Sequence, residues 1–294
     1  MAALMKAATP KATVRELRES EKTALLNLLG DEDAAVYEAV RERILSCGET
    51  ARVWLRPCAL DSNPVRRRRA QEIIRYFDRQ AADNRFLGFC LKHGEDFDLE
   101  QGAWLLAQTH YPDINVEAYA ALLDNFAGEL RQRIAPYTRA HPLLTHLNEY
   151  VFGQLGFTGN EGNYYDPDNS YLNRVLDRRT GNPINLCLVY LLLARRLRLP
   201  VSGIGLPGHF LCRYQSASDE LYIDAFNRGK LLTKGDCVHY LVRGNYDLKD
   251  EYLSPVSPRR MLARICDNLH QIYGRLGHNE SVTRFQRYLV ALAR

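Results

Sequence analysis

Three side chains in the second half of the sequence have the types and the order that acyl transfer through a thiol requires. Cys187 lies near the start of an apolar segment, His209 opens the run HFLCRY, and Asp224 lies within the next run, LYIDAF. In this chemistry a thiolate attacks the acyl carbon, an imidazole takes and returns the proton, and a carboxylate orients the imidazole. The sequence therefore predicts a catalytic site made of Cys187, His209 and Asp224.

The segments around these residues predict one buried helix followed by three strands. Asn182 and Pro183 are favoured types for the cap and the first position of a helix, and the segment INLCLVYLLLARRL is apolar almost all round. Pro200 ends this helix, and three strand-like runs follow it, at 201–206, 209–214 and 221–226. We expect the helix to be buried against the sheet that these strands form.

The strand register decides which of these side chains can meet. Residues that pair across antiparallel strands share a face of the sheet. A hairpin that pairs Tyr214 with Leu221 puts His209 and Asp224 on one face, and Cys212 on the other, where a small core residue is expected. A buried carboxylate needs a partner, so contact between His209 and Asp224 is expected whether or not the pair is catalytic.

A wider set of motifs resembles the SirB-type, transglutaminase-like core family of bacteria. The matching motifs are DPDNSYLNRVL at 166–176, RTGNPINL at 179–186 and LPGHFL at 206–211. Residues 98–127 resemble the helical region before that core, and the tail resembles its tetratricopeptide-like end. The resemblance implies a papain-like α+β fold with a Cys–His–Asp arrangement, in which His209 and Asp224 match the family's histidine and acid.

One position departs from the pattern of ordinary transglutaminases. When the end of the apolar helix is aligned with theirs, their cysteine falls on Pro183, and Cys187 lies four residues later, about 6 Å further along the axis. The effect of the helix dipole fades beyond the first turn, and burial raises a thiol pKa. Two functions stay open: a protein- or peptide-binding regulatory module (a pseudoenzyme), which we favour, and an active cysteine-dependent amide hydrolase or acyl transferase.

The whole chain is predicted to be an α+β protein with an all-helical N-terminal part, a transglutaminase-like core and a C-terminal helical hairpin. HEAT-like helices are expected because a capped or acidic start followed by an amphipathic helix occurs twice, 29 residues apart. In chain order, the expected parts are a flexible start at 1–20, HEAT-like helices at 21–85, a helical SirB-type N-terminal region at 86–140, the transglutaminase-like core at 141–256 and a tetratricopeptide-like hairpin at 257–294.

Composition argues against several classes of function. The 39 Lys and Arg residues nearly balance the 35 Asp and Glu residues, which does not indicate a nucleic-acid or membrane partner. The seven cysteines are scattered without a C-x-x-C pair, which indicates reduced thiols in the cytoplasm. The longest apolar run, at 186–194, is half of a membrane span. No motif for a cofactor or a metal is present, so we expect neither.

Overall fold

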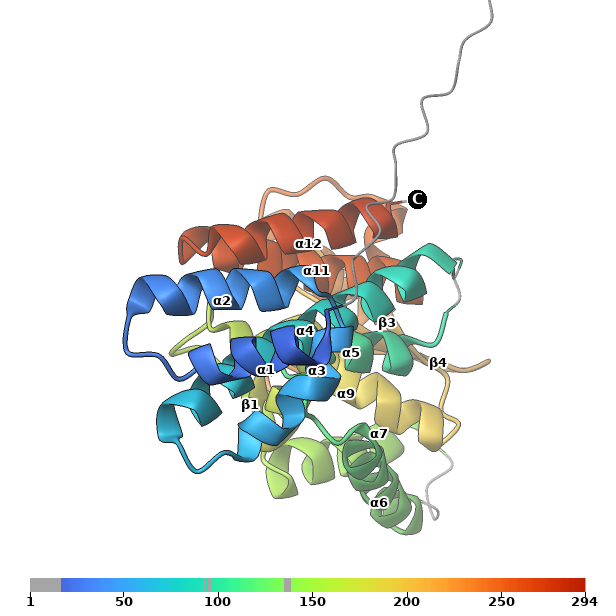
Figure 1. The fold of residues 1–294 in the computed structure, drawn as a ribbon. Coiled ribbons are helices and arrows are strands. Elements are labelled where there is room, and N and C mark those ends of the chain that lie inside the picture. Colours follow the sequence, from blue (N-terminus) through green and yellow to red (C-terminus); the bar gives the residue numbers. More distant parts are fainter. Residues whose placement is uncertain (1–16, 93, 95–96, 135–138, 294) are drawn as a thin grey trace, which may run out of the picture. The chain divides into compact units, whose positions relative to one another are not determined.

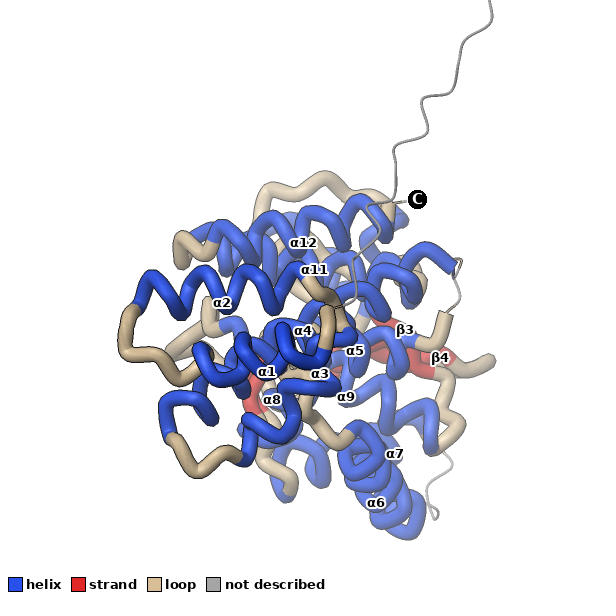
Figure 2. The backbone as a smooth tube through the Cα atoms, viewed as in Figure 1, coloured by secondary structure: helices blue, strands red, loops and turns tan. Residues whose placement is uncertain are grey.

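The computed structural model describes residues 17–92, 94, 97–134 and 139–293. Most of the predicted flexible start at 1–20 therefore lies outside the described residues. Helices predominate and the strands are short (Figure 2), so the chain has the predicted α+β class. It divides into two compact units, Met1–Ala81 and Ala82–Arg294. None of the helices in the described ranges has the length and apolar character to cross a membrane.

The first unit is a group of short helices followed by the beginning of a long one. Asp33 and Asn63 begin two of these helices, because their side chains accept hydrogen bonds from the backbone N–H groups of Ala35 and Val65 at 2.8 and 2.9 Å. Ile44 and Ile73, the residues related by the offset of 29, both lie in the core of this unit. The HEAT-like relationship stays a prediction. The elements are α1 (Glu19–Leu28), α2 (Ala34–Ser46), α3 (Thr50–Leu55), a 3-10 turn (Arg56–Leu60) and α4 (Pro64–Lys92), which continues into the second unit.

The second unit contains the remaining helices. Asp98 caps one of them by accepting from Glu100 N and Gln101 N, and Asn115 caps the next by accepting from Ala118 N. The helices are α5 (Leu99–Gln108), α6 (Val116–Ile134), α7 (Ala140–Asn148), a π-helical turn (Glu149–Gln154), η3 (Pro167–Ser170), α8 (Leu172–Arg178), α9 (Pro183–Arg196), α10 (Lys234–Arg243), η4 (Asp250–Leu253), α11 (Pro258–Arg275) and α12 (Asn279–Leu292).

A four-stranded antiparallel sheet lies against the apolar helix α9. Tyr214 pairs with Leu221, as predicted, and Cys212 pairs with Ile223. The sequence prediction missed the last strand of this sheet, and it also missed a separate two-stranded parallel pair, β1 (Thr158–Gly159) with β2 (Thr180–Gly181). The sheet has the order β3 (Val201–Ile204), β4 (Leu211–Gln215), β5 (Glu220–Asp224) and β6 (Lys230–Leu232).

The C-terminal helices α11 and α12 pack against each other as the predicted hairpin (Figure 1). Gly277 adopts a φ of +70° in the turn between them, a backbone conformation that favours glycine. The rings of Tyr273 and Phe285 stack across the hairpin with centroids 5.6 Å apart. Its relationship to tetratricopeptide repeats, like the other domain boundaries, stays a prediction.

The buried Arg259 at the start of α11 ties three helices together. Its guanidinium donates to Leu292 O, Ala291 O and Cys90 O at 2.8, 2.7 and 3.0 Å, so it satisfies carbonyl groups at the C-terminal ends of α12 and α4. Because these carbonyls are buried with it, removing the guanidinium leaves acceptors without a donor.

We predict that Arg259→Met lowers the free energy of unfolding by about 3 kcal/mol, because charge-assisted hydrogen bonds are lost and their acceptors stay buried. Urea unfolding followed by the fluorescence of Trp104, in a Trp54→Phe background, measures the free energy of unfolding of the second unit. The neighbouring exposed residue provides the control, since Arg260→Met should change the value by less than about 0.5 kcal/mol. Equal effects of the two substitutions would contradict this role of Arg259.

Candidate functional site

The turn before β4 places His209 beside the end of β5. Pro207 and Gly208 occupy the middle of this turn, Gly208 has a φ of +72°, and His209 N donates to Leu206 O at 3.2 Å. This arrangement is that of a type II turn, which requires glycine at its third position. The P-G-H-F motif is thus explained by backbone geometry that sets the direction of the imidazole.

His209 and Asp224 are in contact, with 3.0 Å between Nε2 and Oδ2. Their side chains are only 13% and 8% exposed, and the ring nitrogen Nε2 is not aligned for a straight hydrogen bond to the carboxylate. Asp224 also accepts from the Asn227 side chain at 2.7 Å and from its backbone N–H at 3.2 Å. Burial alone would raise the pKa of Asp224, but His209 and Asn227 hold it below its usual range.

Cys187 lies in the core, away from the surface of the site. It is fully buried in the second turn of α9, where its thiol donates to Phe210 O at 3.4 Å. Cys212, on the other face of β4, donates to Cys187 O at 3.7 Å. Burial raises the pKa of the Cys187 thiol well above its ordinary value, and the neighbouring Cys212 and Asp224 raise it further. The structure thus brings together two of the three predicted site residues.

Two adjoining cavities meet at His209, and we call them together the His209 cleft. Their volumes are about 300 and 430 Å³, and both are lined by Tyr164, Pro183, Gly208 and His209. The smaller cavity, the polar lobe, is also lined by Asn182 and by a stripe of α11 made of Arg264, Asn268, Gln271 and Arg275. The larger cavity, the apolar lobe, is also lined by Leu206, Leu211, Phe226, Leu232, Cys237 and Tyr240.

Sequence reasoning missed the contribution of α11 to this cleft. Arg264, Asn268, Gln271 and Arg275 recur at spacings of four, three and four residues, so they share one face of the helix. That spacing was the available signal. The same spacing of polar residues occurs on the solvated face of any amphipathic helix. These residues line a cleft only because α11 packs beside the turn at His209.

The first residue of α9 that lines the cleft is Pro183, the position at which the alignment with transglutaminases places their cysteine. Cys237 is the one cysteine among the described residues that line the two lobes. Burial raises the pKa of Cys237 to about 12, with Asp236 and Asp224 adding to the shift, so this thiol is protonated at neutral pH. Neither Cys187 nor Cys237 has the environment of an activated nucleophile.

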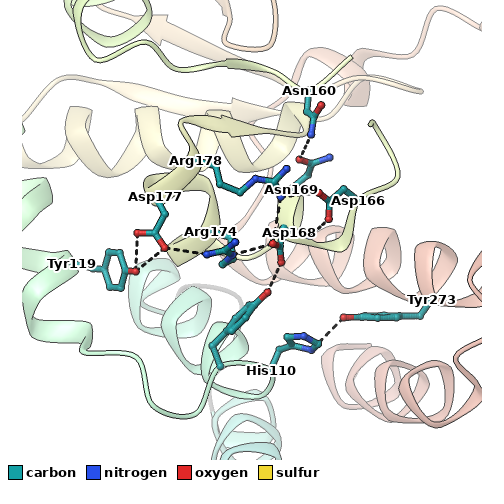
Figure 3. A network of polar contacts seen from close by, with 11 residues as sticks. His110, Tyr119, Asn160, Asp166, Asp168, Asn169, Arg174, Asp177, Arg178 and Tyr273 are labelled. Carbon is teal, nitrogen blue, oxygen red and sulfur yellow. Dashed lines mark hydrogen bonds and ion pairs between the residues drawn. The ribbon is translucent and has the colours of Figure 1, made fainter. Parts of the chain in front are cut away.

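The loop that carries Tyr164 into the cleft is held by Asn169. The Asn169 side chain donates to Asn163 O at 2.8 Å and to Tyr164 O at 3.1 Å. It also accepts from Asn160 at 2.9 Å (Figure 3). Asn169 therefore satisfies the carbonyl groups of this loop. Asn169 does not cap the next helix, because Tyr171 occupies the cap position of α8.

The two aspartates of the same motif are bound by arginines of α8 (Figure 3). Arg178 contacts Asp166 at 2.7 Å, Arg174 contacts Asp168 at 2.9 Å, and Tyr111, in the loop after α5, also donates to Asp168. Burial would raise the pKa of Asp168, yet its bonds with Tyr111 and Arg174 keep it lowered. These acids serve to fix the loop, and the described part of the chain shows no cluster of three side chains suited to a metal ion.

Comparison with known proteins agrees with the fold and the site motifs. The family model described as the transglutaminase-like superfamily matches residues 117–267. This chain therefore belongs to the transglutaminase-like superfamily. Within it, the chain is of the SirB type, since it is similar to the bacterial proteins described next.

The chain is 36% identical over 188 residues to a UPF0162 protein of Xylella fastidiosa, which covers 61% of this chain and 66% of that protein. It is 26% identical over 152 residues to Protein SirB1 of Salmonella typhimurium, covering 50% of this chain and 56% of that protein. It is also 30% identical over 243 residues to F-box only protein 21 of Homo sapiens, covering 72% of this chain and 38% of that protein. No solved structure matches the chain.

We predict that Asp224→Asn lowers the free energy of unfolding by about 1–2 kcal/mol at pH 7, because a carboxylate with several partners is replaced. The pKa of Asp224 is lower in the folded protein, so its contribution is complete above the unfolded pKa of about 4 and is lost as the pH falls further. Urea unfolding between pH 7 and pH 3 should show the difference from wild type shrinking in acid.

The exposed Asp247 provides the matched control for this series. Asp247→Asn should leave stability within about 0.5 kcal/mol of wild type throughout the pH range. A difference between Asp224→Asn and wild type that is constant from pH 7 to pH 3 would contradict the proposed ionisation of Asp224.

Proposed function

We propose that this protein is a peptide-binding member of the transglutaminase-like superfamily, a pseudoenzyme in which His209 and Asp224 serve recognition instead of acyl transfer. The observation that carries the proposal is Pro183. This residue begins α9 and lines both lobes beside His209, so the place for a thiolate at the helix start is taken by a side chain without a nucleophile. The seven free cysteines support a cytoplasmic location as part of the same proposal.

The thiols near the site support recognition over catalysis. Nucleophilic catalysis requires a thiolate within hydrogen-bond reach of the imidazole. Cys187 is fully buried and its thiol is bonded to a backbone carbonyl, while Cys237 is protonated at neutral pH. Activation of Cys187 would require the chain to move its thiol out of a packed core.

The lining of the cleft favours a peptide as its ligand. Its two lobes have the volumes of small-molecule or short-peptide sites, and one is polar while the other is apolar. Tyr164, Tyr165 and Tyr240 border it, and tyrosine supplies both contact area and hydrogen bonds in recognition surfaces. The second ring nitrogen of His209, Nδ1, has no partner among the described residues and is available to a peptide amide or carbonyl.

The competing function is a cysteine-dependent amide hydrolase or acyl transferase. The contact between His209 and Asp224 favours it, since such a pair orients an imidazole for proton transfer. In that case Cys187 would be the nucleophile, and peptides would be cleaved or attached covalently during incubation.

A random hexapeptide mixture incubated with the immobilised protein tests the proposal. We expect mass spectrometry to show at least tenfold enrichment of a subset of intact peptides by the wild-type protein. His209→Trp, which fills the junction of the two lobes, should abolish the enrichment, whereas Leu248→Trp at an exposed position should preserve it. The proposal fails if wild type and His209→Trp retain the same peptides, and cleaved or covalently bound peptides would support the enzyme instead.

A further inference from the structure

We infer that the polar lobe of the His209 cleft binds a carboxylate of the peptide, while an apolar side chain of the same peptide occupies the apolar lobe. This inference rests on the proposed function and specifies the chemistry of its ligand. Three observations support it: the arginines of α11, the absence of acidic groups in the lining of the polar lobe, and the bonds within the protein that already occupy the acids of the apolar lobe.

Arg264 brings a positive charge to the polar lobe without a counter-ion. One nitrogen of its guanidinium, Nη2, donates to Leu206 O and His209 O at 2.8 Å each, so the group braces the turn that carries the imidazole. It makes no ion pair with any residue in the described ranges. A partly buried guanidinium that is bonded only to neutral carbonyls is stabilised by an anion placed beside it.

The remaining donors of the polar lobe are suited to the same anion. Arg275 lies over the ring of Tyr165, with 3.9 Å between its guanidinium carbon and the ring centroid. Asn268 lies between the two arginines on the same face of α11, while the amide of Gln271 beside it already donates to Asp267. At the start of α9, the backbone N–H of Ile184 has no acceptor within the described part of the chain, and Ile184 also lines this lobe.

The lining of the polar lobe supplies no carboxylate to pair with its arginines. None of the residues that line it is Asp or Glu. Asp267, the acid next to Arg264 on α11, accepts instead from the side chain of Gln271 at 2.7 Å. A planar carboxylate is a favourable ligand for arginine because it accepts two parallel hydrogen bonds.

The apolar lobe fixes the direction in which such a peptide lies. Two carboxylates line this lobe, and both are engaged within the protein: Asp224 with His209 and Asn227, and Asp236 with the backbone and hydroxyl of Thr233 at 2.7 Å each. They repel a second carboxylate, while Leu211, Leu232 and the neighbouring rings accept an apolar side chain. The ligand therefore has its carboxylate on the α11 side of His209 and its apolar group on the β5–α10 side.

Four synthetic hexapeptide mixtures of equal apolar content test this assignment. They combine the presence or absence of Asp and Glu with a free or an amidated C-terminus. We expect the immobilised full-length protein to retain peptides from every mixture that offers a carboxylate, and about tenfold less from the amidated mixture without Asp and Glu. Two of the mixtures offer only one kind of carboxylate: the amidated mixture with Asp and Glu offers side chains, and the free mixture without them offers the C-terminus. Comparing their retention shows which kind of carboxylate the polar lobe binds.

Charge-neutral variants of α11 locate the effect. Arg264→Gln should remove the preference for carboxylates, and Arg275→Gln, at an exposed position, should weaken it even if Arg264→Gln disturbs the turn. Arg260→Gln, which is exposed on the same helix and outside the cleft lining, should keep the full preference.

Equal retention of all four mixtures by the wild type would overturn the carboxylate assignment while leaving peptide binding intact. A preference that survives in both Arg264→Gln and Arg275→Gln would also overturn it. Retention of none of the mixtures would instead overturn the proposed function itself, and with it this inference.

Discussion

The near-complete burial of α9 determines where every group of the site lies. This helix packs against α6 and α8 on one side and against β3 and β4 on the other, and most of its residues are inaccessible to water. Because each buried aliphatic side chain contributes about 1.5–3 kcal/mol, the helix cannot slide or rotate without a large loss of stability. Pro183 is therefore held at the edge of the cleft, and Cys187 is held one turn inside the core.

This constraint makes the position of the thiol independent of the contact between His209 and Asp224. The pairing of β4 with β5 and the turn at Gly208 preserve the contact between His209 and Asp224. The position of the thiol depends on α9 alone. In the proposed function, the chain therefore keeps an imidazole and a carboxylate in contact while proline occupies the helix start beside them.

Local rules in the sequence predicted the contact within the sheet and the helix starts. The pairing of Tyr214 with Leu221 follows from hairpin geometry, and it places His209 and Asp224 on one face. The start of α9 was also recognisable, because Asn182 and Pro183 are favoured types for a helix cap and first position, and Asn182 accepts from Asn185 N as a cap should.

Features that depend on packing between distant segments were not predictable from the sequence. The short strand β6 has too few residues for an alternating pattern, and it is defined only by its pairing with β5. The start of α8 carries no recognisable cap, because Tyr171 occupies the cap position without a side-chain hydrogen bond and Asn169 bonds to the loop around Tyr164. The role of α11 in the cleft follows from its position near His209, which no pattern within α11 reveals.

The alkylation rate of each cysteine as a function of pH, measured by mass spectrometry, tests the central claim most directly. We predict that Cys187 reacts slowly at neutral pH and that His209→Ala does not change its rate. As a positive control, Pro183→Cys should introduce a thiol that is alkylated at pH values below the ordinary thiol pKa of about 8.5. This reactivity should be lost when Pro183→Cys is combined with His209→Ala. Fast alkylation of Cys187 at neutral pH that requires His209 would contradict the account and indicate a working thiolate–imidazolium pair.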